Sequence, residues 1–324
     1  MAEVIKGMLR RSFGRSAIGQ GLTAFALAVS VGCAGTLPTS EQHTPADHSH
    51  RMASVPPPAA VVKAPAPVPR ERIGPDGTKI IHYDLTLEEK TVNFSGKPVK
   101  GLTVNGTIPG PVIEVEEGET LEIKVCNETD AETNVHWHGL LVPPDQDGVP
   151  HLNTQPIIQH SCHTHRIPLR EGQWGTYWYH AHAHMQEQRG VYGNLIIHPK
   201  DGEKVYADIE VPLILSDWTD ELPKQVMKSL RRDEHFYALQ NGTLQSWDRV
   251  IGAGPEAIKH RLDNSWVKGM MPMDIADVAY DAFLSNGHKT QTIHGVGHGD
   301  KVRLRLANAG ASTFFHVQFA GGPM

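Results

Sequence analysis

Short runs of alternating apolar and polar residues dominate the central part of the chain. They include residues 80–87, 112–116, 120–125, 194–198 and 211–215, and turns rich in Gly, Pro and Asn separate them. A period of two places neighbouring side chains on opposite faces of an extended strand, as in an antiparallel sheet with one buried face. The pattern predicts an all-β fold, either a sandwich or a barrel.

The two halves of this region resemble one another. In the first half Asn105-Gly106 precedes Gly118-Glu119 and then Asn127. The second half repeats these residues at the same spacings, as Asn286-Gly287, Gly299-Asp300 and Asn308. Agreement at this many positions predicts two copies of one β-domain. We place them at residues 76–200 and 201–324.

Residues 219–281 interrupt the second copy. Val226, Met227 and Leu230 have the spacing of one helical face, so we expect a partly helical insertion. The methionines at 270, 271 and 273 either fill gaps in a core or offer thioether ligands to cuprous copper. The strand-like run 313–319 is followed by no further strand, so we expect an incomplete second domain and a truncated chain.

Residues 1–34 predict an export signal. Basic residues precede the apolar run 22–31, which is too short to span a bilayer. Arg10-Arg11-Ser-Phe-Gly-Arg15 is similar to the twin-arginine export pattern, so we expect a periplasmic protein. Either Cys33 ends a lipoprotein cleavage box and carries a lipid anchor, or cleavage after Ala34 removes it. Residues 35–75, rich in Pro and Ala, predict a solvated tether.

Composition narrows the function. The chain has 30 Lys and Arg against 36 Asp and Glu, a net charge of -6, so nucleic acid is not an expected partner. Three cysteines are too few for a disulfide framework or a cysteine-rich metal site. The 20 histidines stand out, because neutral imidazole is a preferred ligand of transition metals.

Paired histidines occur in two short strings, Asn134-Val-His136-Trp-His138-Gly139 and Tyr177-Trp-Tyr-His180-Ala-His182. Residues i and i+2 of a strand share a face, so each string presents two imidazoles side by side. Four imidazoles without a carboxylate pattern suit copper or zinc better than magnesium or calcium. The alternative, histidines bonded to backbone carbonyls, explains one such string better than two. We predict metal ligands at His136, His138, His180 and His182.

These strings resemble the first-domain signature of multicopper oxidases, together with residues 186–193. Residues 215–220 and 273–278 resemble the periplasmic copper-resistance branch of that family. The resemblance covers residues 76–324 and implies tandem cupredoxin-like Greek-key β-sandwiches. By this resemblance His136 binds the type 2 copper, and His138, His180 and His182 bind the type 3 pair.

The resemblance also implies an activity. Such an enzyme oxidises a reducing substrate, cuprous ion or a phenol, one electron at a time and reduces dioxygen to water. Asp147, in Asp147-Gly-Val-Pro150, resembles a family carboxylate that helps deliver protons to bound oxygen, a role that a nearby carboxylate can perform. The alternative is an ordinary Asp-Gly turn.

One departure from the family concerns the type 1 copper. That site needs a cysteine and two histidines, which the family carries in a His-Cys-His string of a third domain. Neither Cys126 nor Cys162 has histidine on both sides. We interpret the chain as an inactive fragment whose missing third domain supplies the remaining ligands. The alternatives are an exported copper-sequestering protein without turnover and a zinc hydrolase on a β-sandwich.

A second departure is the segment His160-Ser-Cys162-His163-Thr-His165. Relatives carry aromatic residues where His163 and His165 stand. These two share a strand face opposite Cys162, and they are either an accessory copper or zinc site or replacements on a surface strand. A disulfide between Cys126 and Cys162 is compatible with the periplasm, but the sequence does not establish the distance between the sulfurs.

Overall fold

The computed structural model describes residues 68–232, 237, 247–266 and 278–318. The predicted export signal, Cys33 and the methionines at 270, 271 and 273 lie outside these residues. So does most of the predicted tether, over residues 35–67. None of the helices within the described ranges has both the length and the apolar character required to cross a membrane.

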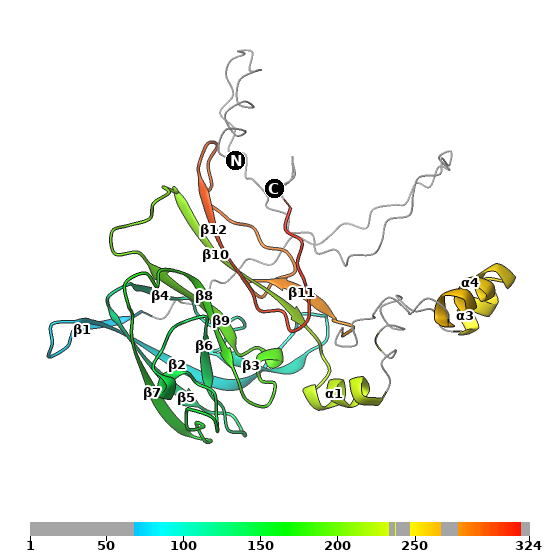
Figure 1. Ribbon diagram of the computed structural model, residues 1–324, viewed down its shortest axis with the longest axis horizontal. Coiled ribbons are helices and arrows are strands. Elements are labelled where there is room, and N and C mark those ends of the chain that lie inside the picture. Colours follow the sequence, from blue (N-terminus) through cyan, green and yellow to red (C-terminus); the bar gives the residue numbers. More distant parts are fainter. Residues whose placement is uncertain (1–67, 233–236, 238–246, 267–277, 319–324) are drawn as a thin grey trace, which may run out of the picture.

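The first half of the fold consists of two packed sheets (Figure 1). One sheet holds, in spatial order, β1 (Arg70–Ile73), β2 (Lys79–Val92), β5 (Thr120–Asn127) and β7 (Ser161–Pro168), with β3 (Val99–Val104) also paired to β2. The other holds β4 (Ile113–Glu116), β9 (Tyr192–His198), β8 (Gly175–Ala181) and β6 (Val135–His138). The predicted all-β fold is confirmed, as a sandwich rather than a barrel.

Alternating side chains of these strands form the core between the sheets. Leu85 and Leu87 of β2 and Leu121, Ile123 and Val125 of β5 are fully buried. The intervening residues of β5 are polar, and most of them face outward. The period of two in the sequence therefore corresponds to one buried and one solvated face.

The second half is a three-stranded sheet that repeats part of the first. Its order is β11 (Ala282–Ser285), β10 (Ile209–Trp218) and β12 (Val302–Asn308). In both halves a long strand pairs in parallel with one strand and antiparallel with a second. In the first half β2 pairs in this way with β5 and β3, and in the second half β10 pairs with β12 and β11. The topology repeats as the sequence predicts.

The repeated Asn-Gly turns make the same hydrogen bonds. Asn105 accepts from the Thr86 backbone N–H through its side-chain oxygen at 2.6 Å and donates to the Asp84 carbonyl at 2.9 Å. Asn286 does the same with Ile214 at 2.8 Å and Pro212 at 2.9 Å. Both asparagines have positive φ, 52° and 48°, which asparagine tolerates better than most residues. The repeated Asn-Gly residues thus have the same local structure in both halves.

A second apolar cluster joins the two halves. Tyr192 of β9 packs with Ile214 and Trp218 of β10, and its hydroxyl donates to Ser216 at 2.8 Å in a buried position. Trp178 of β8 packs against the same cluster. The three-stranded sheet of the second half therefore packs against the same face of β8 and β9 that carries His180.

Helices occupy much of residues 219–281, as predicted. They are α1 (Pro223–Arg232), α3 (Trp247–Gly252) and α4 (Pro255–Trp266), and two short 3-10 helices lie in the first half, η1 (Pro144–Gln146) and η2 (Glu187–Arg189). Val226, Met227 and Leu230 lie on α1. The helices α3 and α4 lie beside each other and away from the sheets (Figure 1).

Two sequence expectations differ from the structure. Residues 313–318 belong to no strand, so that part of the predicted strand is wrong. Backbone N–H groups at 311–313 donate to the carboxylate of Asp217, which holds the chain in a loop before that run. Conversely β1 lies within the predicted tether, because Arg70 and Arg72 form ion pairs with Asp84 and Glu122 across the sheet.

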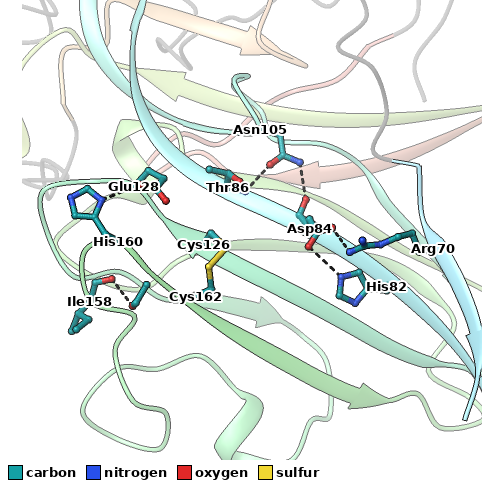
Figure 2. Close-up of a disulfide and its surroundings, with 11 residues drawn as sticks. Arg70, His82, Asp84, Thr86, Asn105, Cys126, Glu128, Ile158, His160 and Cys162 are labelled. Carbon is teal, nitrogen blue, oxygen red and sulfur yellow. Dashed lines mark hydrogen bonds and ion pairs between the residues drawn. A yellow bond between two sulfur atoms is a disulfide. The ribbon is translucent and has the colours of Figure 1, made fainter.

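A disulfide joins Cys126 to Cys162 (Figure 2). The two residues are register partners on β5 and β7, with Cα atoms 4.1 Å apart, and lie on the outer face of the sheet. The sequence left open whether Cys126 and Cys162 form a disulfide, and the structure shows that they do. It fixes β7 against the centre of its sheet.

Charged groups of the two halves also lie close together, since ligand atoms of His198, Glu203 and Glu210 are within 4.8 Å of one another. Nε2 of His198 on β9 lies 3.0 Å from Glu114 of β4. Close by, Nε of Arg305 on β12 donates to Glu210 of β10 at 2.7 Å, and Arg305 also contacts Glu203. The hydrogen bond to Glu114 raises the pKa of His198, and the same bond lowers the pKa of Glu114.

These shifts predict a pH window for the Glu114–His198 pair. The contribution from Glu114 is lost as pH falls through its lowered pKa, and that from His198 is lost as pH rises through its raised pKa. The pair should stabilise the fold most between the ordinary pKa values, 4.5 and 6.5. Because both side chains are partly exposed, we expect Glu114→Gln to lower the free energy of unfolding by about 0.5 kcal/mol in this window.

Urea unfolding at pH 5.5 and pH 8.5 measures the effect. Glu116→Gln, on the same exposed face of β4, is the control and should change little at either pH. A loss that is equal at both pH values would contradict the assignment.

Candidate metal centre

The candidate site lies on the β6–β8 ladder. These strands pair antiparallel, with His136 opposite His180 and His138 opposite Trp178. Opposed residues of a ladder share a face, as do residues i and i+2 of one strand. The backbone therefore gathers His136, His138 and His180 on one face, and the buried Trp137 and Tyr179 lie on the other.

The imidazoles are close enough to share metal ions. Ring nitrogens of His136, His138 and His180 all lie within 4.8 Å of one another, and Nδ1 of His138 is 3.0 Å from Nε2 of His180. His182 follows the end of β8, with its ring centre 5.5 Å from that of His136 and 5.8 Å from that of His180. The structure thus brings together all four histidines that the sequence singled out.

Hydrogen bonds orient two of these rings. Nδ1 of His136 donates to the carbonyl of Asp147 at 2.7 Å. Nδ1 of His180 donates to the carbonyl of Ala181 at 3.0 Å and lies 2.9 Å from a carboxylate oxygen of Glu187. With the proton on Nδ1, each Nε2 keeps its lone pair for a metal ion. Such partners are usual behind metal-bound histidine.

Trp178 limits the motion of the rings. It stacks on His180 with ring centres 4.3 Å apart and on His138 at 5.0 Å. Desolvation lowers the pKa of His138, and the neighbouring imidazoles lower it further. A neutral imidazole is the form that binds metal.

Asp147 lies directly behind His136. Its Oδ1 is 3.4 Å from Nδ1 of His136, and its Oδ2 accepts from Asn153 at 3.0 Å. The next residue, Gly148, has φ of 78°, and a Cβ there would lie 1.8 Å from the carbonyl oxygen of Val135. Asp147 is therefore both part of an Asp-Gly turn and a neighbour of His136. The close approach of Gly148 to Val135 brings the Asp147 carboxylate next to β6.

Sequence analysis missed two residues of this site. Glu187 lies in the segment 186–193 that resembles the family, and Trp178 lies in the string around His180, but neither pattern predicts a role for them. Their contacts depend on how η2 and β8 pack, which no spacing reveals. His184 has a positive φ of 49° and lies 3.4 Å from Glu132, beyond the end of β8.

The donor set fits copper. Two metal–imidazole bonds of about 2 Å that meet at roughly a tetrahedral angle place their nitrogens about 3.3 Å apart, near the 3.0 Å between His138 and His180. Another group, His198, Glu203 and Glu210, also clusters within 4.8 Å. There Arg303 and Arg305 already pair with the carboxylates, so that group is an ion-pair network.

Removing the carboxylate behind His180 tests the site. We expect Glu187→Ala to weaken copper binding about 10-fold, because His180 loses a partner that fixes its ring and proton. Glu187→Gln keeps an acceptor oxygen and should lose less. Competition with a chromogenic chelator measures the affinity.

Glu128→Ala is the matched control, since Glu128 also pairs with a histidine, the exposed His160 (Figure 2). The control should bind copper as the unsubstituted chain does. Equal affinity in all three variants would contradict a role for Glu187.

Comparison with known proteins agrees with this geometry. Residues 86–202 match the multicopper oxidase family model. The chain is 36% identical over 255 residues to a copper resistance protein A homolog of Pseudomonas syringae, covering 76% of this chain and 42% of that protein. It is 34% identical over 244 residues to copper resistance protein A of Escherichia coli, covering 74% and 40%.

Among solved structures, blue copper oxidase from Nitrosomonas europaea aligns with a TM-score of 0.49 and 27% identity, over 71% of this chain and 61% of that chain. The chain spans about two fifths of the length of the two copper resistance proteins. The family match over the first sandwich and the similarity to the two copper resistance proteins show that the chain belongs to the multicopper oxidase family, whose cofactor is copper.

Proposed function

We propose that this chain forms part of a copper-dependent oxidase and that His136, His138, His180 and His182 are ligands of its oxygen-reducing copper cluster. The observation that carries the proposal is the convergence of three ring nitrogens within 4.8 Å on paired strands. His182 lies beside them. Resemblance to the family assigns His136 to the type 2 copper and the other three to the type 3 pair.

Copper would supply one-electron transfer and the binding of dioxygen. The chain's own residues would hold the ligands in place and handle protons. The side chain of Asp147 is about one quarter exposed, so its carboxylate touches both solvent and His136. Oδ1 of Asp147 is then suited to pass protons from solvent toward the site, which the reduction of dioxygen to water requires.

The electron entry would come from another domain. A type 1 copper needs a cysteine thiolate, and the disulfide removes Cys126 and Cys162 from that role. The described part of the first sandwich therefore supplies histidines but no thiolate. A further cupredoxin domain would add the type 1 site and the remaining cluster ligands, in keeping with the greater length of the relatives.

The names of the relatives bear on the substrate, and the N-terminal sequence bears on the location. Because two relatives are named for copper resistance, we favour cuprous ion as the reducing substrate. Another relative is named laccase, so phenols are the second candidate class of substrate. The predicted twin-arginine signal supports export to the periplasm, with or without a lipid on Cys33.

Copper titration of residues 35–324 tests the ligand assignment. We expect the double variant His138→Gln, His180→Gln to lose copper that the unsubstituted chain binds, because two of the converging nitrogens are removed. His198→Gln removes a histidine outside the site and should keep that copper. Unchanged copper content in the double variant would refute the assignment.

Dioxygen uptake tests the need for a further domain. With cuprous ion or a phenol as reductant, residues 35–324 should consume no dioxygen beyond that consumed by free copper. A protein that continues in frame with a His-Cys-His string should turn over. Steady turnover by residues 35–324 would contradict the proposed electron entry, and a complete protein without such a string would instead favour copper sequestration.

A further inference from the structure

A third pair of histidines faces the interior of the sandwich. His163 and His165 lie on β7, opposite the core residues Val125 and Ile123 of β5. Their ring centres are 4.6 Å apart, closer than the 5.3 Å between His138 and His180. The two rings lean toward each other from neighbouring inward positions of one strand.

The nitrogens of this pair are buried and unpartnered. His165 is fully buried, and the Nε2 atoms of His163 and His165 both lack a hydrogen-bond partner. Nδ1 of His165 donates to the carbonyl of Gln146 at 3.2 Å, so its Nε2 carries a bare lone pair. A buried polar atom left without a partner is unfavourable, and a ligand bound at that atom would remove the cost.

Protonation does not satisfy this lone pair. Burial, with a smaller effect of the neighbouring His163, lowers the pKa of His165 to about 4. The groups that shift the pKa of His165 are His163 and the carbonyl of Gln146, and neither is a carboxylate. The ring of His165 also packs edge-on against Trp137, with ring centres 5.2 Å apart. His165 is therefore neutral over the ordinary pH range and able to bind metal.

We propose that His163 and His165 bind one cuprous ion between their Nε2 atoms, as a copper site separate from the four-histidine cluster. Zinc in protein sites takes four ligands or three with water, whereas His163 and His165 offer two imidazoles to the ion. Cuprous copper accepts two neutral nitrogen ligands. A single charge also costs far less to bury than a double charge in apolar surroundings such as those beside Ile123 and Val125.

The position of His163 and His165 on β7 indicates how an ion would enter and where the site lies relative to the four-histidine cluster. His163 is only partly buried, and β7 is the last strand in the order of its sheet, so the ion would enter from that edge. Trp137, which packs on His165, lies between the cluster residues His136 and His138 on β6. The proposed site thus lies behind the cluster, across β6.

Anaerobic titration with cuprous ion against bicinchoninate tests the proposal. The unsubstituted residues 35–324 should bind one more cuprous equivalent than the double variant His163→Phe, His165→Phe. Phenylalanine keeps a ring of similar size in the core, and melting curves check the fold. His160→Phe, at the exposed start of β7, is the matched control and should keep the equivalent. Equal stoichiometry in the double variant and the unsubstituted chain would refute the site.

A second measurement needs no substitution in the pair. Silver(I) is a diamagnetic stand-in for cuprous ion, so nitrogen-15 spectra of histidine-labelled protein should show shifted Nε2 resonances of both His163 and His165. The His138→Gln, His180→Gln variant should show the same shifts, since this site does not depend on the cluster. Absence of the shifts, or loss of a zinc equivalent rather than a cuprous one in the phenylalanine variant, would overturn the proposal.

Discussion

The register of β6 against β8 is the constraint on which the candidate centre depends. A slip of one residue would turn every side chain of a strand to the opposite face. Trp137 and Tyr179 are fully buried on the core side, and burying two such large rings fixes the register. The same register determines where His136, His138 and His180 lie on the other face. Apolar packing on one side of the ladder thus sets the ligand geometry on the other.

The second sheet contributes to the same geometry from outside the sandwich. Trp178 stacks on two of the four histidines and also packs against the cluster that includes Trp218 and Ile214. Trp178 therefore contributes both to the packing between the two halves and to the positions of His138 and His180. A change in that packing would therefore reach the imidazoles of His138 and His180 through the side chain of Trp178.

Local patterns in the sequence were sufficient for the strands, the repeat and the four clustered histidines, because a period of two and a fixed spacing of Asn-Gly turns depend on few neighbours. What they missed depends on distant partners. The strand at 70–73 exists through arginine pairs with Asp84 and Glu122. The run at 313–318 looks like a strand but no neighbouring strand pairs with it in the described chain. The positions of Glu187 and of the Cys126–Cys162 bond likewise required the packed fold.

The same His-x-His spacing occurs on β6 and β7, yet the two pairs meet different surroundings. The β6 pair lies on the partly solvated face of its sheet, near the carboxylates of Asp147 and Glu187, where water and acidic groups can compensate a divalent charge. The β7 pair faces Ile123 and Val125 in the core. Spacing specifies that two imidazoles share a face, but solvation decides which ion that face can hold. The metal that a His-x-His motif binds can therefore be inferred only when the burial of its strand is also known.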